Sequence, residues 1–398
     1  MIPTKIRLSA STPATHVATW AFLAVAAVAL TARAGERQAF EEFSGPWGML
    51  QTYDVLIAAP DWALDMVPQP SSQTVWTFAG LDPDEVAEAI GQAGLPPEVA
   101  RELLDRDRWR VIDGRIQIEP SRAALVALPP AARAAIYDVL AKTAENEFQV
   151  DPYYVPHNDV RRWLAGAGLR AELVDAIEKT SYPVGRAIAF SDLPLLIAMT
   201  ESRAEARQVI KSLSRTATVI MRLRLDGDSD LDMIRRYWSA GSANAKDFMP
   251  LLESTATNPE IRHLDIVHIL PPYARKLLYT YPHPSHAVGG RYPDCHWTCL
   301  NFFNYRPEQR LIDTPGANMF VEEEYERVGA PNRFGDVLFL TDTEGRSIHS
   351  CVHLAADFVY TKNGANVLSP WVIMRLADVR NRYSRHGDVE VVTYRRRR

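Results

Sequence analysis

Apolar residues recur at helical spacing along much of residues 82–254. Two short helices are expected between Asp82 and Leu104, each with an acidic or proline-led start. Further helices are expected at 129–142, 159–168, 171–180, 205–214, 229–241 and 245–254. Alternation of apolar and polar residues interrupts this pattern twice. Residues 109–120 alternate around Asp113-Gly114, a pair that suits a tight hairpin turn, and residues 215–225 predict a strand.

One short phrase introduces three helical segments. LPPEVAREL begins at Leu95, LPPAARAAI at Leu128 and LPPYARKLL at Leu270. The irregular spacing argues against a solenoid of repeats. Proline suits the first turn of a helix, where a missing N–H group costs no hydrogen bond. We therefore interpret the phrase as a helix start.

The pattern changes after Leu270. Residues 279–293 predict a loop rich in proline, glycine and aromatic residues, and DCHWTCLNFFNY, from Asp294, opens a helix. FGDVLFLTD, SIHSCVHLAADFVYTKNG and PWVIMRLADV then predict successive strands of an antiparallel sheet. The expected fold class is α+β, with a largely helical N-terminal region followed by a compact C-terminal domain.

The length of the chain indicates more than one domain. At 398 residues it exceeds the size at which single hydrophobic cores stop growing. The predicted divisions are 1–34 as a signal or anchor, 35–145 as a mixed, mostly helical region with a hairpin, 146–260 as a helical region, and 261–398 as the C-terminal domain.

The N-terminus predicts export. Lys5 and Arg7 precede the apolar run VATWAFLAVAAVAL, and Ala32-Arg33-Ala34 follows it. This order is typical of a Sec-type signal peptide cleaved after Ala34. The alternative is an uncleaved membrane anchor, since residues 9–15 could lengthen the apolar segment. Both interpretations predict a periplasmic, envelope-associated or secreted protein.

Charge and cysteine content limit the kinds of function that the chain can have. A net charge of −5 does not suit a protein built mainly to coat nucleic acid, and the sequence suggests no cofactor. Three cysteines are too few for a disulfide scaffold of this size, and the odd count leaves at least one thiol free. The cysteines are therefore candidates for a chemical role.

Cys295 is the candidate nucleophile. Residues 289–293, GGRYP, cannot readily be helical, so Asp294 is expected to cap the next helix and Cys295 to be its first residue. A thiol at this position meets the positive end of the helix dipole and free backbone N–H groups, which favour the thiolate. The same N–H groups can stabilise an oxyanion. Cys299, one turn later, is expected to be less activated.

His349 is the candidate general base. Along SIHSCVHLA, His349, Cys351 and His353 alternate and so share one face of the predicted strand. If the helix packs on that face, Cys295 meets His349 at the rim. Cys299 then meets Cys351 one layer deeper, as a disulfide or as two packed thiols.

The base needs an orienting partner from the returning strand, FVYTKNG. A three-residue loop centred on Ala356 places Asn363 opposite His349, and a loop moved back by one residue places Thr361 there. Either side chain can accept the imidazole N–H and fix the tautomer, the third role in a Cys-His-polar triad. Asn363 is the better acceptor, and Thr361 stays open as the alternative.

Together these features resemble a known family. DC at a helix start, GDVLFL before a strand, and HSCVHLAADFVY resemble DCSGF, GDLVFF and HVGIYLG of the NlpC-type papain-like cell-wall cysteine peptidases. Cys295, Gly335-Asp336 and His349 fall on the matching positions, in the same chain order. The resemblance covers the last third of the chain. It implies a papain-like domain, a Cys-bearing helix packed on an antiparallel sheet, that hydrolyses an amide or peptide bond in peptidoglycan.

Some positions depart from that family. The small residues after its cysteine are replaced by His296 and Trp297, so a bulkier cleft rim is expected. Its upstream tyrosine matches only loosely, to Tyr281 or Tyr292. We take these four residues as candidates for substrate binding.

Alternatives to the hydrolase stay open. Possible zinc ligands occur in three groups: HPSH at 283–286, the Cys295, His296 and Cys299 group, and the His349-Cys351-His353 row. No C-x-x-C pair is present, so no metal is assigned. Cys295 could instead be a small buried residue. A non-catalytic envelope binding or scaffolding protein that keeps the fold is the alternative from another class. The favoured hypothesis is an exported cysteine hydrolase whose partner is peptidoglycan or another envelope peptide.

Overall fold

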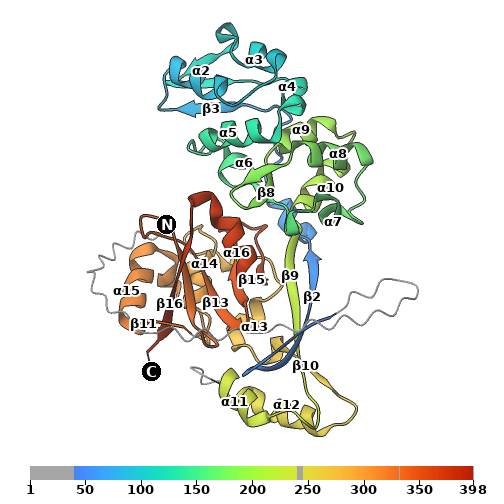
Figure 1. The fold of residues 1–398 in the computed structure, drawn as a ribbon, viewed down its shortest axis with the longest axis vertical. Coiled ribbons are helices and arrows are strands. Elements are labelled where there is room, and N and C mark those ends of the chain that lie inside the picture. Colours follow the sequence, from blue (N-terminus) through green and yellow to red (C-terminus); the bar gives the residue numbers. More distant parts are fainter. Residues whose placement is uncertain (1–39, 240–244, 331, 398) are drawn as a thin grey trace. The chain divides into compact units, whose positions relative to one another are not determined.

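The computed structural model describes residues 40–239, 245–330 and 332–397, which form a mixed α+β protein with several antiparallel sheets (Figure 1). The chain divides into two compact units. Unit 1 comprises the described residues up to Ile57, Ala217–Arg380 and the residues from His386 onward, and unit 2 comprises Ala58–Thr216 and Asn381–Arg385. The predicted signal or anchor, residues 1–34, lies outside the described residues. Among those described, no helix has the length and apolar character needed to cross a membrane.

Unit 2 is mainly helical and contains two small antiparallel sheets, with strand orders β3-β5-β4 and β6-β8-β7. Its helices are α1 (Asp61–Asp65), α2 (Pro83–Gly91), α3 (Pro97–Leu103), α4 (Arg122–Ala127), α5 (Pro130–Leu140), α6 (Glu147–Val150), α7 (Val160–Leu164), α8 (Ala171–Thr180), α9 (Leu193–Met199) and α10 (Arg203–Leu213). Its strands are β3 (Trp76–Ala79), β4 (Arg110–Ile112), β5 (Arg115–Ile118), β6 (Tyr153–Tyr154), β7 (Tyr182–Val184) and β8 (Ala187–Phe190).

Local sequence signals account for many of these element ends. Asp82 caps α2 in a capping box with Glu85. Asp113 and Gly114 have φ values of 51° and 72°, as the predicted tight turn between β4 and β5 requires. In each of the three LPP phrases, the second proline is the first residue of a helix. These helices are α3, α5 and, in unit 1, α13 (Pro272–Leu277). The predicted hairpin and helix starts are confirmed.

The core of unit 2 contains a buried ion pair. Arg133 of α5 and Asp192, just before α9, are both fully buried and form an ion pair. The Arg133 guanidinium also donates to Tyr137 Oη over 2.9 Å and to the Leu125 carbonyl. Burial strongly raises the pKa of the Tyr137 phenol, so that hydroxyl stays protonated and donates to Asp192. This network ties α5 to the segment that enters α9.

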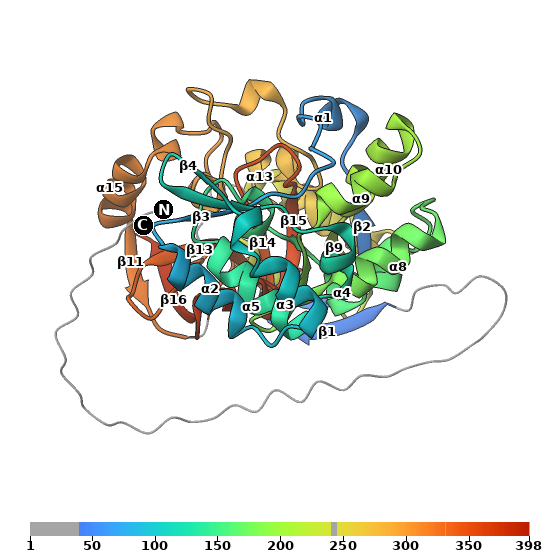
Figure 2. The same ribbon diagram turned by 90° about the horizontal axis from the view of Figure 1, so that it is seen from above.

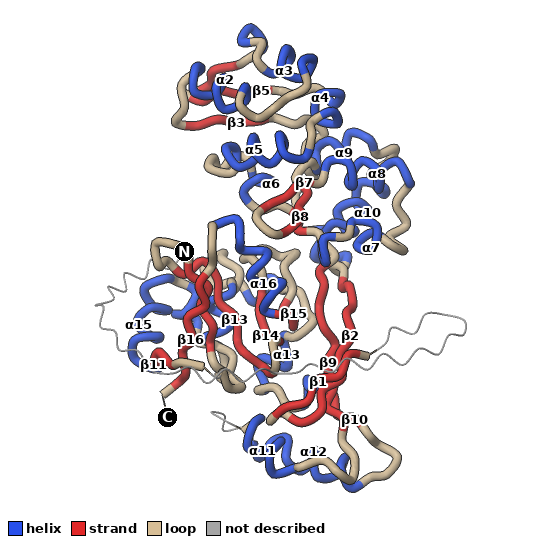
Figure 3. Tube along the Cα trace, viewed as in Figure 1, coloured by secondary structure: helices blue, strands red, loops and turns tan. Residues whose placement is uncertain are grey.

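Unit 1 contains two larger sheets. A four-stranded sheet has the order β1-β2-β9-β10, and a six-stranded antiparallel sheet has the order β11-β16-β12-β13-β14-β15 (Figure 3). The strands are β1 (Glu41–Gly45), β2 (Gly48–Ile57), β9 (Thr216–Arg224), β10 (His263–Asp265), β11 (Tyr325–Val328), β12 (Val337–Thr341), β13 (Ser347–Ala355), β14 (Phe358–Lys362), β15 (Trp371–Arg375) and β16 (Glu390–Arg396). The helices besides α13 are α11 (Leu231–Trp238), α12 (Ala245–Thr257), α14 (Cys295–Leu300), α15 (Thr314–Glu324) and α16 (Leu376–Tyr383).

The division into units differs from the predicted boundaries at 145 and 260. The described residues before Ala58 form strands, and β9 joins them, so both segments belong with the C-terminal sheet. One continuous core contains Leu50, Val219 and Tyr360. Thr218 of β9 also exchanges hydrogen bonds with the backbone of Ile373 in β15, at 3.0 and 3.1 Å. Burial of apolar surface against the six-stranded sheet decides this division.

Three C-terminal elements differ from the expected pattern. The predicted strand PWVIMRLADV ends at Arg375, and α16 begins at Leu376. Helix α15 and the edge strand β11, neither of which was predicted, follow α14 and lie side by side at one end of the six-stranded sheet (Figure 2).

Candidate active site

Cys295 lies where the sequence predicts it, at the first position of α14. Gly289 and Gly290 have φ values of 57° and 79°, a left-handed conformation that a helix cannot continue. Asp294 then caps the helix, since its Oδ1 accepts the Trp297 N–H over 2.8 Å. Cys295 is 8% exposed, whereas Cys299 and Cys351 are 1% and 0% exposed. The prediction of the cap is confirmed.

Helix α14 packs on one face of the six-stranded sheet, and two contacts, with the strand register, identify that face. The ring of His296 stacks on Phe339 of β12, with centroids 6.0 Å apart. The indole Nε1 of Trp371 in β15 donates to Thr298 Oγ1 over 3.0 Å. Phe339 pairs directly with Ser350 of β13, and directly paired residues share a face. Ser350 is therefore on the side of α14.

His349, Cys351 and His353 point to the opposite face, because side chains alternate along a strand. The expectation that α14 packs on this His-Cys-His row is therefore wrong. The other row carries Val352 and Leu354, and both belong to the core that contains the α14 side chains. Packing the helix on the more apolar row removes more apolar area from water.

Helix α14 begins near the end of the sheet where β13 starts. Phe302, just after the helix, lies against Tyr360 of β14, with ring centroids 5.4 Å apart. Thr298, one turn earlier, bonds to Trp371, which pairs with Lys362. Because β14 runs antiparallel to β13, the step from Tyr360 to Lys362 leads toward the start of β13. Cys295 thus lies toward the end of β13 that carries His349.

A β-bulge adjoins His349. Leu340 pairs with His349 and Thr341 pairs with Ser347, so Ile348 is the extra residue on β13. Bulges bend a strand and re-aim side chains, and they are common beside active sites. The bulge thus bends β13 immediately before His349, the candidate base.

Thr361, rather than Asn363, holds the imidazole of His349. His349 Nε2 lies 2.9 Å from Thr361 Oγ1, and both residues are completely buried. Thr361 Oγ1 also donates to the Ser350 carbonyl over 3.3 Å. With its single hydroxyl proton used there, Oγ1 accepts from His349 in the tautomer that carries its proton on Nε2. We assign this tautomer from the hydrogen bonds, and in it Nδ1 carries the lone pair.

Asn363 has a different environment. Its Nδ2 lies 3.0 Å from the sulfur of Met374, and its buried Oδ1 has no hydrogen-bond partner within the described part of the chain. Val352 pairs with Tyr360 and His353 with Val359, and extension of this register sets Asn363 opposite His349, as a loop centred on Ala356 predicts. The predicted three-residue loop is wrong in length, because a register shift pairs Ala355 with Phe358 and leaves only Ala356 and Asp357 in the turn. The diagonal neighbour Thr361 nevertheless makes the contact.

The two deeper cysteines are protonated thiols. Burial, together with the neighbouring Cys351, raises the pKa of Cys299 well above its usual value. Burial also raises the pKa of Cys351 strongly, with a smaller effect from Cys295. All three cysteines are free thiols. The disulfide that the sequence left open is absent between Cys299 and Cys351, both of which are described residues.

The four candidate substrate-binding residues lie mostly inside unit 1. Burial lowers the pKa of His296, opposed by Asp294, so its stacked ring is neutral near pH 7. Trp297 is 2% exposed and packs edge-on against Tyr273. Tyr281 is buried and donates to the Ile57 carbonyl over 3.2 Å, and Tyr292 is half-buried. His296 and Trp297 therefore support the helix from within, instead of forming the bulky rim that we expected.

Asp336, the acidic residue of the GD motif, is a structural anchor. Its carboxylate accepts two hydrogen bonds from Arg395 of β16, at 2.8 and 2.7 Å, and one from the Arg333 N–H. The Asp336 backbone also pairs with His353. Burial lowers the pKa of His353 to about 4, although Asp336 opposes the shift. The pairing of β16 with β12 brings Arg395 to Asp336, and nothing local in the sequence indicates this pairing.

No three His, Cys, Asp or Glu side chains of the described residues gather closely enough to hold a metal ion. Comparison with known proteins adds no relative: no family model, curated protein or solved structure matches the chain.

Proposed function

We propose that unit 1 is an exported cysteine hydrolase with a papain-like fold, which cleaves an amide or peptide bond in peptidoglycan stem peptides or another envelope peptide. The observation that carries the proposal is the buried hydrogen bond between His349 Nε2 and Thr361 Oγ1. It orients an imidazole and sets its tautomer, as a general base requires. The capped start of α14 at Cys295 and the order of the DC, GD and His motifs support it further.

In the proposed mechanism, Cys295 attacks the carbonyl carbon while His349 Nδ1 takes the thiol proton. The tetrahedral intermediate collapses to a thioester, and His349 returns the proton to the leaving amine. Water then hydrolyses the thioester with His349 again as base. The Cys295 N–H can stabilise the oxyanion, because Asp294 occupies the N–H groups of Trp297 and Thr298 instead.

The proposal requires the Cys295 thiol and the His349 ring to meet at the end of the sheet where α14 begins. Helix α14 contacts β13, and the bulge at Ile348 lies just before His349 on that strand. The two side chains cannot meet farther along β13, where α14 covers the Ser350 row.

A non-catalytic scaffold is the second candidate, and one observation favours it. His349 points to the sheet face opposite the one that α14 covers. A protein that keeps the fold for binding alone does not need the two groups to meet.

Hydrolysis of purified peptidoglycan fragments distinguishes the two functions. We expect Cys295→Ala and His349→Ala to lower kcat at least about 10³-fold. Cys299→Ala is the matched thiol control, and its fold is checked by urea unfolding because the site is buried. Activity that persists in Cys295→Ala rejects the proposed nucleophile. Wild-type protein that binds the fragments without cleaving them supports the scaffold.

A further inference from the structure

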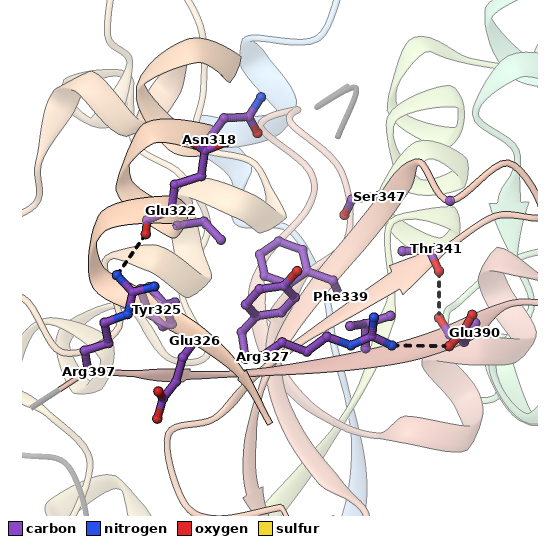
Figure 4. A pocket seen from close by; sticks show the side chains of 14 residues that line it. Asn318, Glu322, Tyr325, Glu326, Arg327, Phe339, Thr341, Ser347, Glu390 and Arg397 are labelled. Atoms are coloured by element: carbon purple, nitrogen blue, oxygen red, sulfur yellow. Dashed lines mark hydrogen bonds and ion pairs between the residues drawn. The ribbon is translucent and has the colours of Figure 1, made fainter. Parts of the chain in front are cut away.

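A pocket of about 480 Å³ lies between α15 and the strands β11, β12 and β16 (Figure 4). Its wall is mainly apolar, and its apolar and aromatic residues are Val321, Tyr325, Phe339, Val392 and Tyr394. The rings of Phe339 and Tyr394 meet edge to face, with centroids 5.3 Å apart. This volume falls within the range of small-molecule sites, which are concave and largely apolar. We call it the α15 pocket.

Charged groups lie around the wall of the α15 pocket, and they carry both signs. Arg327 faces Glu390 at 3.9 Å, and Arg397 donates to the backbone carbonyl of Glu322 over 3.0 Å (Figure 4). Glu326 adds another carboxylate to the lining. A lining with two arginines and three glutamates does not suit a phosphate or another strong anion. It suits an apolar group carried on a neutral, hydrogen-bonding backbone.

The α15 pocket touches both segments of the candidate active site. Phe339 forms part of its wall and also stacks on His296, the residue after Cys295. Ser347 lines the pocket, and its hydroxyl donates to the carbonyl of His349 over 3.4 Å. Thr341 and Ser347 pair at the bulge that adjoins the candidate base. The pocket therefore lies on the sheet face that α14 covers, next to the helix that begins at Cys295, and contacts His349 through its backbone only.

We propose that the α15 pocket binds an apolar side chain, of leucine to phenylalanine size, at a residue near the scissile bond of an envelope peptide other than a peptidoglycan stem peptide. This inference rests on the proposed hydrolase function. The apolar wall favours such a side chain over glycine or a charged residue, since burying leucine or phenylalanine removes a large apolar area from water. Backbone groups of the peptide would lie at the polar end, near Thr341 and Ser347.

Two variants fill the pocket from opposite walls. Val321→Trp enters from α15, and Thr341→Trp enters from β12. Met319→Trp is the matched control, because Met319 is also on α15 but is 53% exposed and does not line the pocket. Urea unfolding of each variant verifies that the fold is retained.

Binding is measured first, in the Cys295→Ala background, so that the result does not depend on catalysis. The probes are N-acetyl amides of glycine, alanine, leucine and phenylalanine, titrated by NMR. We expect the leucine and phenylalanine probes to bind about 10–100-fold more tightly than the glycine probe. Val321→Trp and Thr341→Trp should remove this preference, and Met319→Trp should retain it. Equal affinity across the series, or a preference that both filling variants retain, overturns the inference.

Cleavage is measured next, with peptides that differ only in one side chain. In the active enzyme, the ratio of kcat/KM for leucine over glycine should fall about 10–100-fold in the two filling variants. An unchanged ratio overturns the assignment of the pocket to the substrate. If the wild-type protein cleaves no peptide, the proposed function fails, while selective binding in the first experiment still shows that the pocket accepts apolar side chains.

Discussion

The substitution Thr361→Val tests how His349 is held. Valine has nearly the shape of threonine but lacks the hydroxyl that accepts the His349 Nε2–H over 2.9 Å. Thr361→Ser keeps a hydroxyl and removes only a methyl group, so it is the matched control. Asn363→Leu tests the rival orienting residue, whose amide contacts Met374.

The magnitude follows from the burial of both partners. In Thr361→Val, the His349 Nε2–H loses its acceptor and the Ser350 carbonyl loses a donor, inside a sheet where both His349 and Thr361 are 0% exposed. An unsatisfied buried polar group costs about 1–3 kcal/mol, so the free energy of unfolding should fall by that amount. Loss of the fixed tautomer should lower kcat about 10–100-fold, equivalent to about 1.4–2.8 kcal/mol.

Three measurements check this expectation. Urea unfolding gives stability, peptide hydrolysis gives kcat as a function of pH, and ¹⁵N NMR reports which imidazole nitrogen of His349 carries the proton. Thr361→Ser should stay within about threefold of wild-type kcat and keep the Nε2–H tautomer. Asn363→Leu should leave kcat nearly unchanged, because Asn363 does not orient His349. A fully active Thr361→Val enzyme, or a serine variant as impaired as the valine variant, would refute the assigned role.

The remaining predictions concern labelling, pH and stability. Iodoacetamide at pH 8 should modify Cys295 at least tenfold faster than the other two cysteines, whose buried thiols have raised pKa values; mass spectrometry of the native protein checks the selectivity. The free energy of unfolding should fall by about 3 kcal/mol from pH 6.5 to 4. The reason is that the pKa of His353 is lowered to about 4 in the folded protein, so on acidification the unfolded chain takes up the proton at a higher pH than the folded protein does. His353→Gln should flatten this dependence, as measured by urea unfolding at each pH. Arg133→Met should cost about 3–5 kcal/mol by leaving the buried Asp192 without its cationic partner. In contrast, Arg161→Met, at an exposed ion pair, should cost less than about 1 kcal/mol. Equal losses in these two variants would contradict the role assigned to the buried pair.

The sequence by itself determined the features that depend on neighbouring residues. Asp294 caps α14 and makes Cys295 its first residue, because the preceding Gly-Gly-x-x-Pro segment cannot be helical. The Asp113-Gly114 turn and the proline-led helices follow from equally local rules. Alternation along β13 identified His349, Cys351 and His353 as one row, and the pairing of His353 with Val359 agrees with a hairpin centred on Ala356, although its turn is one residue shorter than predicted. These features depend on backbone dihedrals and spacing, which a short segment already encodes.

Only the tertiary structure decided which surfaces meet. Helix α14 lies on the Val352 row because that row offers more apolar area, and no local signal shows which of two buried rows a distant helix will cover. The same long-range packing brings β9 against β15, through Thr218 and Ile373, and pairs Asp336 with Arg395. It also selects Thr361 over Asn363, since a diagonal contact in a twisted sheet depends on side-chain geometry as well as on register. The sequence therefore indicated the candidate chemical groups, and packing between segments far apart in the chain decided how they are arranged.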